Sequence, residues 1–432
     1  MSDKSFRGQQ ILAVVSMYFG YAMFMVLRMI PAVVGGAMRQ DPSLQIDLEQ
    51  LGQIFALGTC GAIVGKFIGG FAADKLGGKL TFAVGLAACS VFVGLFATSN
   101  SLLMFQLAFF FALMAKSLGW PSMTKIIGHW FRPNEYGRVW GIISTSSRVG
   151  TLIATFGFGA LLALMPWRSM LFLCSGVGLL IAVVFALILK EKPAESESPD
   201  NTKETESPDS DMLHHPLRGT TIWQALPRFA ASLQFWLITG SLMALTILWD
   251  FLLLVPSFLQ DRLSLPVEQA SMASSAFPFG SLFSVLVGGF VFDKLNRHTT
   301  AWLMGGLLLI ASGCVGVFLM MPHLDMTPQA LTNLSLVLLF LFGLCISPCY
   351  YIPMSVFSIE FGGPHSGILV SLLDALAFGA CALFYYFAGG LAEASWDRFL
   401  VVLLAVSLSS VITTFCFMKR EARLKNSKTL DI

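Results

Sequence analysis

The chain has 432 residues, a formal net charge of +2, 56% apolar residues and only 12% charged residues. That composition excludes a water-soluble globular protein, because a soluble fold could not cover so much apolar surface. Uncharged stretches of about 20 residues recur, and each is long enough for a helix to cross a hydrocarbon core roughly 30 Å thick. The predicted fold class is an all-α membrane protein, since a membrane barrel would show alternating strands of about ten residues.

Twelve transmembrane helices are predicted, in two six-helix halves. Their approximate ranges are 11–34, 49–72, 80–98, 102–124, 138–164, 168–189, 231–259, 270–292, 300–321, 331–354, 366–390 and 398–418. Lys and Arg gather in the short loops on one side, and such loops stay in the cytoplasm. We therefore expect both termini to be cytoplasmic, and the first apolar run to be a helix rather than a cleaved signal peptide.

The middle of the chain differs in composition from both halves. Acidic residues, Ser, Pro and Thr dominate residues 191–216, which cannot bury enough apolar surface to fold. We expect a disordered cytoplasmic linker there, between an N-terminal six-helix bundle at 1–190 and a C-terminal bundle with a cytoplasmic tail at 217–432. Residues 217–233 are predicted to form either an amphipathic helix at the inner membrane surface or an ordered lead-in to the seventh span.

Four basic residues are predicted to lie inside the membrane in the first half. Arg28 lies eleven residues before Arg39 at the outer boundary, which puts it about 16 Å deep, near the midplane. A charge there costs at least roughly 2.5 to 3.5 kcal/mol, so it should face a cavity. Because a guanidinium offers paired donors to carboxylate or phosphate, substrate binding is favoured over an internal salt bridge. The other three cations are Lys66, Lys116 and Arg148.

Two members of the predicted substrate site have a second interpretation. Lys66 is about six residues from the inner end of its span, so it could extend to the cytoplasmic surface instead. Tyr21 precedes Arg28 by about two turns on nearly the same helix face. Its hydroxyl could hydrogen-bond the same ligand, or its ring could pack against neighbouring apolar side chains. The predicted substrate-binding residues are therefore Arg28, Lys66, Tyr21, Lys116 and Arg148.

The second half supplies two acids inside the membrane. Asp250 lies eleven residues before Asp261, at a depth that matches Arg28, and Asp374 lies in the eleventh span. Burial favours the neutral form of a carboxylic acid, so both are candidates for proton coupling. Two alternatives remain: the acids bind the ammonium group of a zwitterion, or they neutralise cations of the first half. Glu360 is predicted in the loop after the tenth span and is left out of the site.

Other kinds of site are not indicated. The six histidines fall at span ends or in loops, and the eight cysteines lie within apolar spans, where they are expected to pack. No Gly-rich loop with Lys and Ser or Thr marks an ATP site. We expect no enzyme activity, no cofactor, no metal and no nucleic acid partner. The expected partners are a small-molecule substrate, protons or a counter-substrate, and the lipid bilayer, with the protein a monomer.

A phrase at the end of the second span returns at the end of the eighth: GGFAADKL at residues 69–76 and GGFVFDKL at residues 288–295. Duplication of half a chain is typical of transporters. The phrase and the plan of six plus six helices resemble the major facilitator superfamily over nearly the whole chain. That resemblance implies two bundles that rock around a central site. It also implies that four charged residues at the inner ends of these spans act in gating, namely Asp74, Lys75, Asp293 and Lys294. The alternative is that these charges only fix the orientation of the helices in the membrane.

The first half further resembles the organophosphate:phosphate antiporter branch, which includes glycerol-3-phosphate and hexose-phosphate transporters. The stretches that carry this resemblance are FGYA at 19–22 followed by Arg28, GKFI at 65–68, and GWP at 119–121 followed by HWF at 129–131. The resemblance implies a phosphate-binding region at Arg28 and Lys66. The second half departs from the branch, because residues 245–251 read LTILWDF and lack the basic residue that the antiporters place in the seventh helix.

These features predict a secondary active transporter that moves a small organic anion or zwitterion by alternating access, with proton coupling, in the inner membrane of a bacterium. An acid that faces a phosphate dianion would repel it, so phosphate antiport does not follow intact from the resemblance. Organophosphate/phosphate antiport remains the first alternative. A transporter-like membrane sensor of a small anionic metabolite is the second. The sequence does not distinguish symport from antiport.

Overall fold

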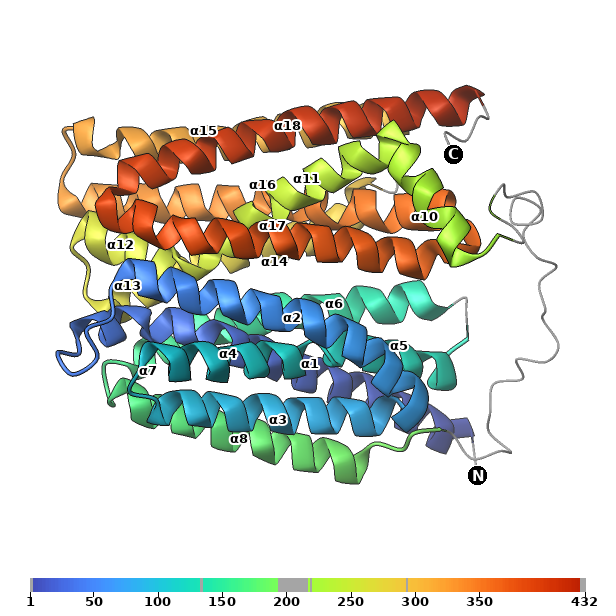
Figure 1. Ribbon diagram of the computed structural model, residues 1–432, viewed down its shortest axis with the longest axis horizontal. Coiled ribbons are helices and arrows are strands. Elements are labelled where there is room, and N and C mark those ends of the chain that lie inside the picture. Colours follow the sequence, from blue (N-terminus) through green and yellow to red (C-terminus); the bar gives the residue numbers. More distant parts are fainter. Residues whose placement is uncertain (1–2, 133–134, 193–216, 218–219, 293, 428–432) are drawn as a thin grey trace. The chain divides into compact units, whose positions relative to one another are not determined.

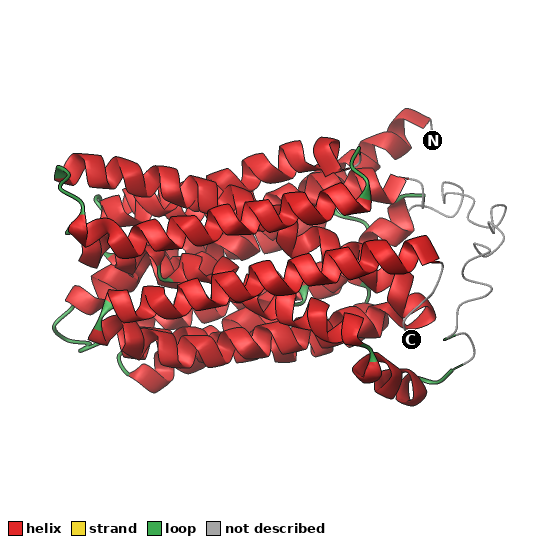
Figure 2. Cartoon of the chain, turned by 90° about the horizontal axis from the view of Figure 1, so that it is seen from above, coloured by secondary structure: helices red, strands yellow, loops and turns green. Residues whose placement is uncertain are grey.

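The computed structural model describes residues 3–132, 135–192, 217, 220–292 and 294–427. The first sequence half contains α1 (Asp3–Gln40), α2 (Leu48–Leu76), α3 (Gly78–Thr98), α4 (Leu102–Lys116), α5 (Gly119–Trp130), α6 (Tyr136–Leu152), a π-helix (Ile153–Phe158), α7 (Gly159–Leu161) and α8 (Trp167–Ile188). The regular elements of the described residues are all helical, joined by short loops (Figure 2).

The second sequence half begins with the helix α10, which precedes the seventh span (Figure 1). Its α-helices are α10 (Ile222–Ala231), α11 (Leu233–Asp250), α12 (Val255–Leu263), α13 (Val267–Ser274), α14 (Ala276–Phe292), α15 (Arg297–Met320), α16 (Pro328–Gly362), α17 (Ser366–Ala394) and α18 (Trp396–Ser427). Short 3-10 helices lie at Phe251–Leu253, Met321–His323 and Gly363–His365.

Eleven stretches of helix among the described residues are long and apolar enough to cross a membrane. The other predicted span, 138–164, corresponds to α6, the π-helix and α7, which follow one another from Tyr136 to Leu161. Its helix changes type in the middle, so no single α-helix covers it. The predicted all-α plan of twelve helices is confirmed.

The end of α16 corrects one prediction. Glu360 was expected in the loop after the tenth span, but α16 continues to Gly362. A run of apolar residues marks only the part of a helix that crosses the hydrocarbon core, whereas the backbone hydrogen bonds continue into the polar region. The helix ends where Gly363 adopts a φ of +47°, a left-handed conformation that glycine reaches at little cost. The prediction for Glu360 is therefore wrong.

The segment before the seventh span is helical. In α10, Phe229 is fully buried and its ring lies 5.6 Å from that of Phe361 near the end of α16. Only Ser232 separates α10 from α11. Since its apolar face packs against the protein, α10 is an ordered lead-in to the seventh span. Whether its exposed Trp223 also meets the membrane surface stays a prediction.

The helices form two compact units. Unit 1 contains the described residues before the linker together with Leu253–Pro278 and Tyr385–Glu393. Unit 2 contains the remaining described residues of the second sequence half. The predicted division at 1–190, 191–216 and 217–432 stays a prediction, and most of its linker lies outside the described residues.

Within unit 1, α2 crosses α4 with its backbone very close. A Cβ atom added at Gly61 or Gly65 would overlap the carbonyl groups of Phe110 and Met114. Small residues at a crossing let two helices approach in the membrane, where close packing drives their association. The crossing fixes the end of α4 against α2, near the predicted site.

Candidate functional site

The predicted substrate residues of the first half all belong to unit 1, on α1, α2, α4 and α6. Arg28 is partly buried and lies twelve residues before the end of α1 at Gln40, about 18 Å along the helix. The continuous helix is the condition for the depth predicted from residue counting, and the depth itself stays a prediction. Pro31, less than one turn later, has no N–H to donate to the carbonyl of Leu27, so the backbone is locally weakened beside Arg28.

The fourth span contains a local interruption next to Lys116. The structure has α4 end at Lys116 and α5 begin at Gly119, but Ser117 and Leu118 between them keep right-handed helical backbone angles. Leu102–Trp130 is therefore one helical stretch that is long and apolar enough to cross a membrane. Pro121 has no N–H to donate to the carbonyl of Ser117, which explains the interruption. Lys116 thus lies within this span, beside a missing helix hydrogen bond.

Lys116 faces a cluster of aromatic rings that sequence reasoning did not identify. Its Nζ lies 6.0 Å from the ring centroid of Tyr21, which is only 6% exposed. The Tyr21 ring lies 5.6 Å from that of Trp120, and Trp120 stacks on Trp140 at 4.5 Å. An ammonium near an aromatic ring is attracted by the negative ring face. The structure therefore brings together Tyr21 and Lys116, two of the predicted residues.

The other two cations occupy different positions. Arg148 lies on α6 and donates from Nη1 to the Ser144 carbonyl at 3.2 Å and to Ser147 Oγ at 2.8 Å. Lys66 lies ten residues before the end of α2 at Leu76, about 15 Å along the helix. The last turn of α2 carries Asp74 and Lys75 and extends beyond the predicted apolar span. Both interpretations of Lys66, a substrate ligand or a side chain that extends to the cytoplasmic surface, therefore stay open.

The two acids belong to unit 2. Asp250 is the last residue of α11, is 3% exposed, and is followed by the 3-10 helix at Phe251–Leu253. Its Oδ2 accepts a hydrogen bond from Cys381 Sγ at 3.3 Å. Asp374, partly buried, precedes Cys381 by two turns on α17. A role of Asp250 and Asp374 in proton coupling stays a prediction.

The predicted gating charges are partly described. Asp74 Oδ1 lies 2.6 Å from Nζ of Lys125 on α5, and Lys75 Nζ lies 4.3 Å from the ring centroid of Phe71. Lys294 is exposed, and Asp293 lies outside the described residues. Lys125 was not identified from sequence, because a single Lys near a helix end carries no distinguishing pattern. A gating role for these charges stays a prediction.

At the predicted outer end, unit 1 joins helices from both sequence halves. Arg39 Nη1 on α1 lies 3.1 Å and 3.0 Å from the two carboxylate oxygens of Asp261 on α12. Glu393 Oε2 accepts from the Leu48 N–H at 2.9 Å, at the start of α2. These contacts hold α1 and α2 against α12 and the end of α17. Both of these segments come from the second sequence half but belong to unit 1. We call this set of contacts the outer closure.

Glycines bring the helix backbones of the outer closure together. A Cβ atom at Gly52 would lie 2.7 Å from the Tyr385 carbonyl oxygen, and one at Gly389 would overlap the Leu48 carbonyl. Phe55 packs one turn deeper, with its ring centroid 5.7 Å from that of Tyr385. The approach of α2 to α17 in this unit therefore depends on two residues without side chains.

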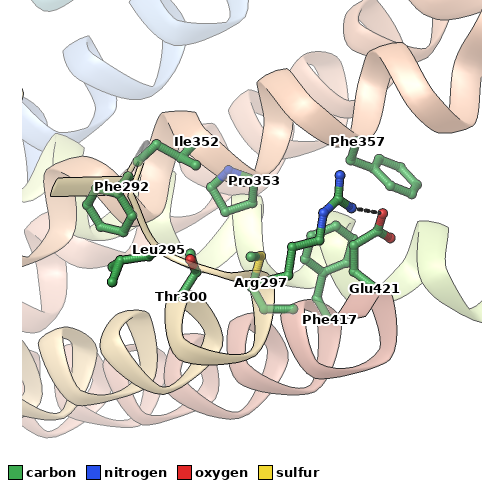
Figure 3. Close-up of a pocket in the computed structure, with 10 residues that line it drawn as sticks. Phe292, Leu295, Arg297, Thr300, Ile352, Pro353, Phe357, Phe417 and Glu421 are labelled. Atoms are coloured by element: carbon green, nitrogen blue, oxygen red, sulfur yellow. Dashed lines mark hydrogen bonds and ion pairs between the residues drawn. The ribbon is translucent and has the colours of Figure 1, made fainter. Parts of the chain in front are cut away.

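A cavity of about 150 Å³ lies within unit 2, between the ends of α14, α15, α16 and α18 (Figure 3). Most of its lining is apolar, and its charged residues pair with each other: Arg297 Nη1 lies 2.9 Å from Glu421 Oε1. Glu421 Oε2 also accepts from Gln234 Nε2 at 2.8 Å. The cavity contains none of the predicted substrate residues, and its neutralised charges do not suit a small anion.

Comparison with known proteins agrees with the helical plan. A family model described as Major Facilitator Superfamily matches residues 11–367. The chain is 28% identical to the hexuronate transporter of Bacillus subtilis (strain 168), over 60% of each protein. It is 24% identical to a probable hexose phosphate transport protein of Chlamydia pneumoniae, over 68% of this chain and 67% of that protein. The match to the Bacillus protein thus spans three fifths of that relative's length.

Two solved structures have the same fold at low sequence identity. One is a bacterial homolog of the human lysosomal transporter Spinster, in an inward-facing and unoccupied conformation, with a TM-score of 0.68 and 17% identity, covering 96% of this chain and 97% of that chain. The other is a D-xylose-proton symporter, with a TM-score of 0.68 and 14% identity, covering 98% of both chains.

Proposed function

Because the chain belongs to the Major Facilitator Superfamily, we propose that this multi-pass membrane protein is a secondary transporter of a small organic anion or zwitterion, held by its anionic group at Arg28 and Lys116. The observation that carries the proposal is the position of Lys116 within the fourth span, with its Nζ 6.0 Å from the ring centroid of Tyr21. Tyr21 lies two turns from Arg28 on α1. A cation at such depth needs a function that offsets its cost.

The names of several relatives support an anionic substrate. They include a hexuronate transporter, a probable L-galactonate transporter of Escherichia coli (strain K12) and probable hexose phosphate transport proteins. A carboxylate or a phosphate ester would satisfy the same cations. In both cases the substrate would enter unit 1 with its negative group toward α1 and α4.

Proton coupling is proposed for Asp250 and Asp374. Asp250 is almost fully buried in unit 2, and its Oδ2 accepts a hydrogen bond from Cys381 Sγ. A substrate anion that moves with a proton would carry less net charge through the membrane. Inner-membrane location and cytoplasmic termini follow from the Lys and Arg distribution and remain part of the proposal.

Replacing Asp250 or Asp374 with Asn is expected to change the pH dependence of transport. If an acid carries the proton, wild-type uptake is faster in acidic than in alkaline buffer, and the Asn variant, which imitates the neutral acid, loses that dependence. The measurement is initial uptake into proteoliposomes at several pH values. Asp325→Asn is the control, because Asp325 is exposed in a loop. Unchanged pH profiles in both variants would exclude both acids as proton carriers.

A direct test of the function is a ligand screen by thermal unfolding of the purified protein. The compounds are sugar acids, sugar phosphates, glycerol 3-phosphate, amino acids and uncharged nucleosides. We expect stabilisation by at least one class of anion and none by the nucleosides. Stabilisation by phosphate esters alone would favour organophosphate/phosphate antiport, and stabilisation by uncharged nucleosides alone would contradict the proposal.

A further inference from the structure

Aromatic and basic side chains meet where the start of α15 packs against the end of α18 in unit 2 (Figure 1). Trp302 on α15 contacts Phe415 on α18, with their ring centroids 4.9 Å apart. The Nζ atom of Lys419 lies 5.6 Å from the Trp302 centroid and 5.3 Å from the Phe415 centroid. Because the face of an aromatic ring attracts a cation, these two rings hold the ammonium group at the surface of the unit.

Two more basic side chains lie beside this contact. His298 precedes Trp302 by about one turn on α15, and Arg423 follows Lys419 by about one turn on α18. Residues four apart share a helix face. His298 and Arg423 are exposed, and Trp302 is 57% exposed. We call His298, Trp302, Lys419 and Arg423 the basic patch.

The acid nearest to these cations on α18, Glu421, faces away from the basic patch. It lies two residues from both Lys419 and Arg423, and residues two apart on a helix do not face each other. Its Oε1 lies 2.9 Å from Arg297 Nη1, and its Oε2 accepts from Gln234 Nε2 at 2.8 Å. The carboxylate thus contacts Arg297 at the cavity of Figure 3, on a different face of α18 from the two cations.

Exposed apolar side chains continue from the basic patch along the same two helix faces. They lie about two to five turns from Lys419 or Trp302, and each is at least 44% exposed: Ile412, Leu408 and Val401 on α18, and Leu309 and Met320 on α15. Both helices contain stretches long and apolar enough to cross a membrane. A strip of exposed apolar side chains along such a span contacts acyl chains, because its contact with water is unfavourable.

The basic patch lies where these apolar strips end, at the level of lipid headgroups. Trp is enriched at the membrane–water interface, and Lys and Arg extend toward the headgroups there. An anionic phospholipid fits both features, because its headgroup complements the charges of Lys419 and Arg423 and its acyl chains cover the strips. We propose that the basic patch binds the headgroup of an anionic phospholipid, such as phosphatidylglycerol. The patch shares no residue with the proposed anion site, so this inference does not depend on the proposed function.

The test measures lipid binding to the full-length protein in detergent by native mass spectrometry. Dioleoyl phosphatidylglycerol and dioleoyl phosphatidylcholine have the same acyl chains and both contain a phosphate, but only phosphatidylglycerol has a net negative charge. The wild type is expected to bind phosphatidylglycerol more tightly. The double variant Lys419→Gln, Arg423→Gln is expected to weaken that binding by about tenfold or more, since each cation near an anionic headgroup contributes about fivefold. Its binding of phosphatidylcholine should stay unchanged.

A matched double variant removes the same charge from unit 1. Arg132 and Arg138 are exposed near the predicted inner end of the fifth span, so Arg132→Gln with Arg138→Gln should keep the preference for phosphatidylglycerol. Trp302→Leu removes one of the rings beside Lys419 and should weaken binding about threefold, and Trp302→Phe should restore it. Thermal unfolding without added lipid shows that each variant is folded.

Three outcomes would overturn the inference. The first is equal affinity of the wild type for the two lipids. The second is an equal loss of phosphatidylglycerol binding in both double variants, which would show attraction by overall charge instead of a site. The third is displacement of phosphatidylglycerol by an equal concentration of inorganic phosphate, which would show that the basic patch binds a soluble anion. A preference for phosphatidylglycerol that only the variants of the basic patch reduce would support it.

Discussion

Replacing Arg28 with alanine is expected to abolish substrate binding and transport while the protein still folds. Arg28 lies within α1, two turns from Tyr21, and a charge inside the membrane needs a function that offsets its cost. Removing one partner of a buried charged contact typically costs about 2 to 5 kcal/mol of binding, or roughly 30-fold to several thousandfold in affinity. The measurement is titration of the anion found in the ligand screen, with thermal unfolding as the test of folding.

Two variants serve as controls for this result. Arg28→Lys keeps the charge but loses the paired donors, so it should bind more weakly than the wild type and more tightly than Arg28→Ala. Arg168 holds a loop by donating to the carbonyls of Ala97 and Ser99. Arg168→Ala should therefore lower the unfolding temperature without altering affinity. Full affinity in a folded Arg28→Ala protein would remove Arg28 from the site.

Replacing Gly389 with valine is expected to slow transport by more than about tenfold while substrate binding persists. The new side chain would overlap the Leu48 carbonyl and the backbone of Glu49, and neither can move without unwinding the start of α2. The outer closure could then form only with a strain of about 1 to 3 kcal/mol or more. A transporter that alternates access must close this end in each cycle. The measurement is the exchange rate of labelled substrate in proteoliposomes.

The same helix provides the matched control. A Cβ atom at Gly379 would meet open space, so Gly379→Val changes the same residue type on α17 without a clash. Transport by Gly379→Val should stay within about twofold of the wild type, since no atom lies within 4 Å of the added Cβ and substitutions that create no clash usually change little. If Gly389→Val exchanges substrate as fast as Gly379→Val, closure of α2 against α17 is not part of the cycle.

The architecture could be predicted from the sequence because the membrane constrains it so strongly. Apolar length fixes the spans, and charge density in the loops fixes the expected orientation. The predicted depth of Arg28 follows from counting residues along an uninterrupted helix, and α1 is helical throughout Asp3–Gln40. The match of residues 11–367 to the superfamily agrees with the resemblance seen in the repeated phrase.

The interior details could not be predicted, for a physical reason. The interruptions of the regular α-helix after Lys116 and Asp250 occur inside continuous apolar runs, where hydropathy gives no signal. Gly119 and Pro121 are the local cues to the first of them. The pairing of Trp120 with Trp140, and of Asp74 with Lys125, depends on how separate helices pack. The roles of the predicted site residues remain predictions, because geometry alone does not show what binds.

The most direct measurement of the central claim is counterflow in proteoliposomes loaded with the unlabelled anion identified in the ligand screen. Wild-type protein should accumulate the labelled anion transiently against its gradient, and Arg28→Ala should not. Such an overshoot requires one site that is exposed in turn to each side of the membrane. Binding of the anion by the wild type without any exchange would contradict transport and would indicate a membrane sensor instead.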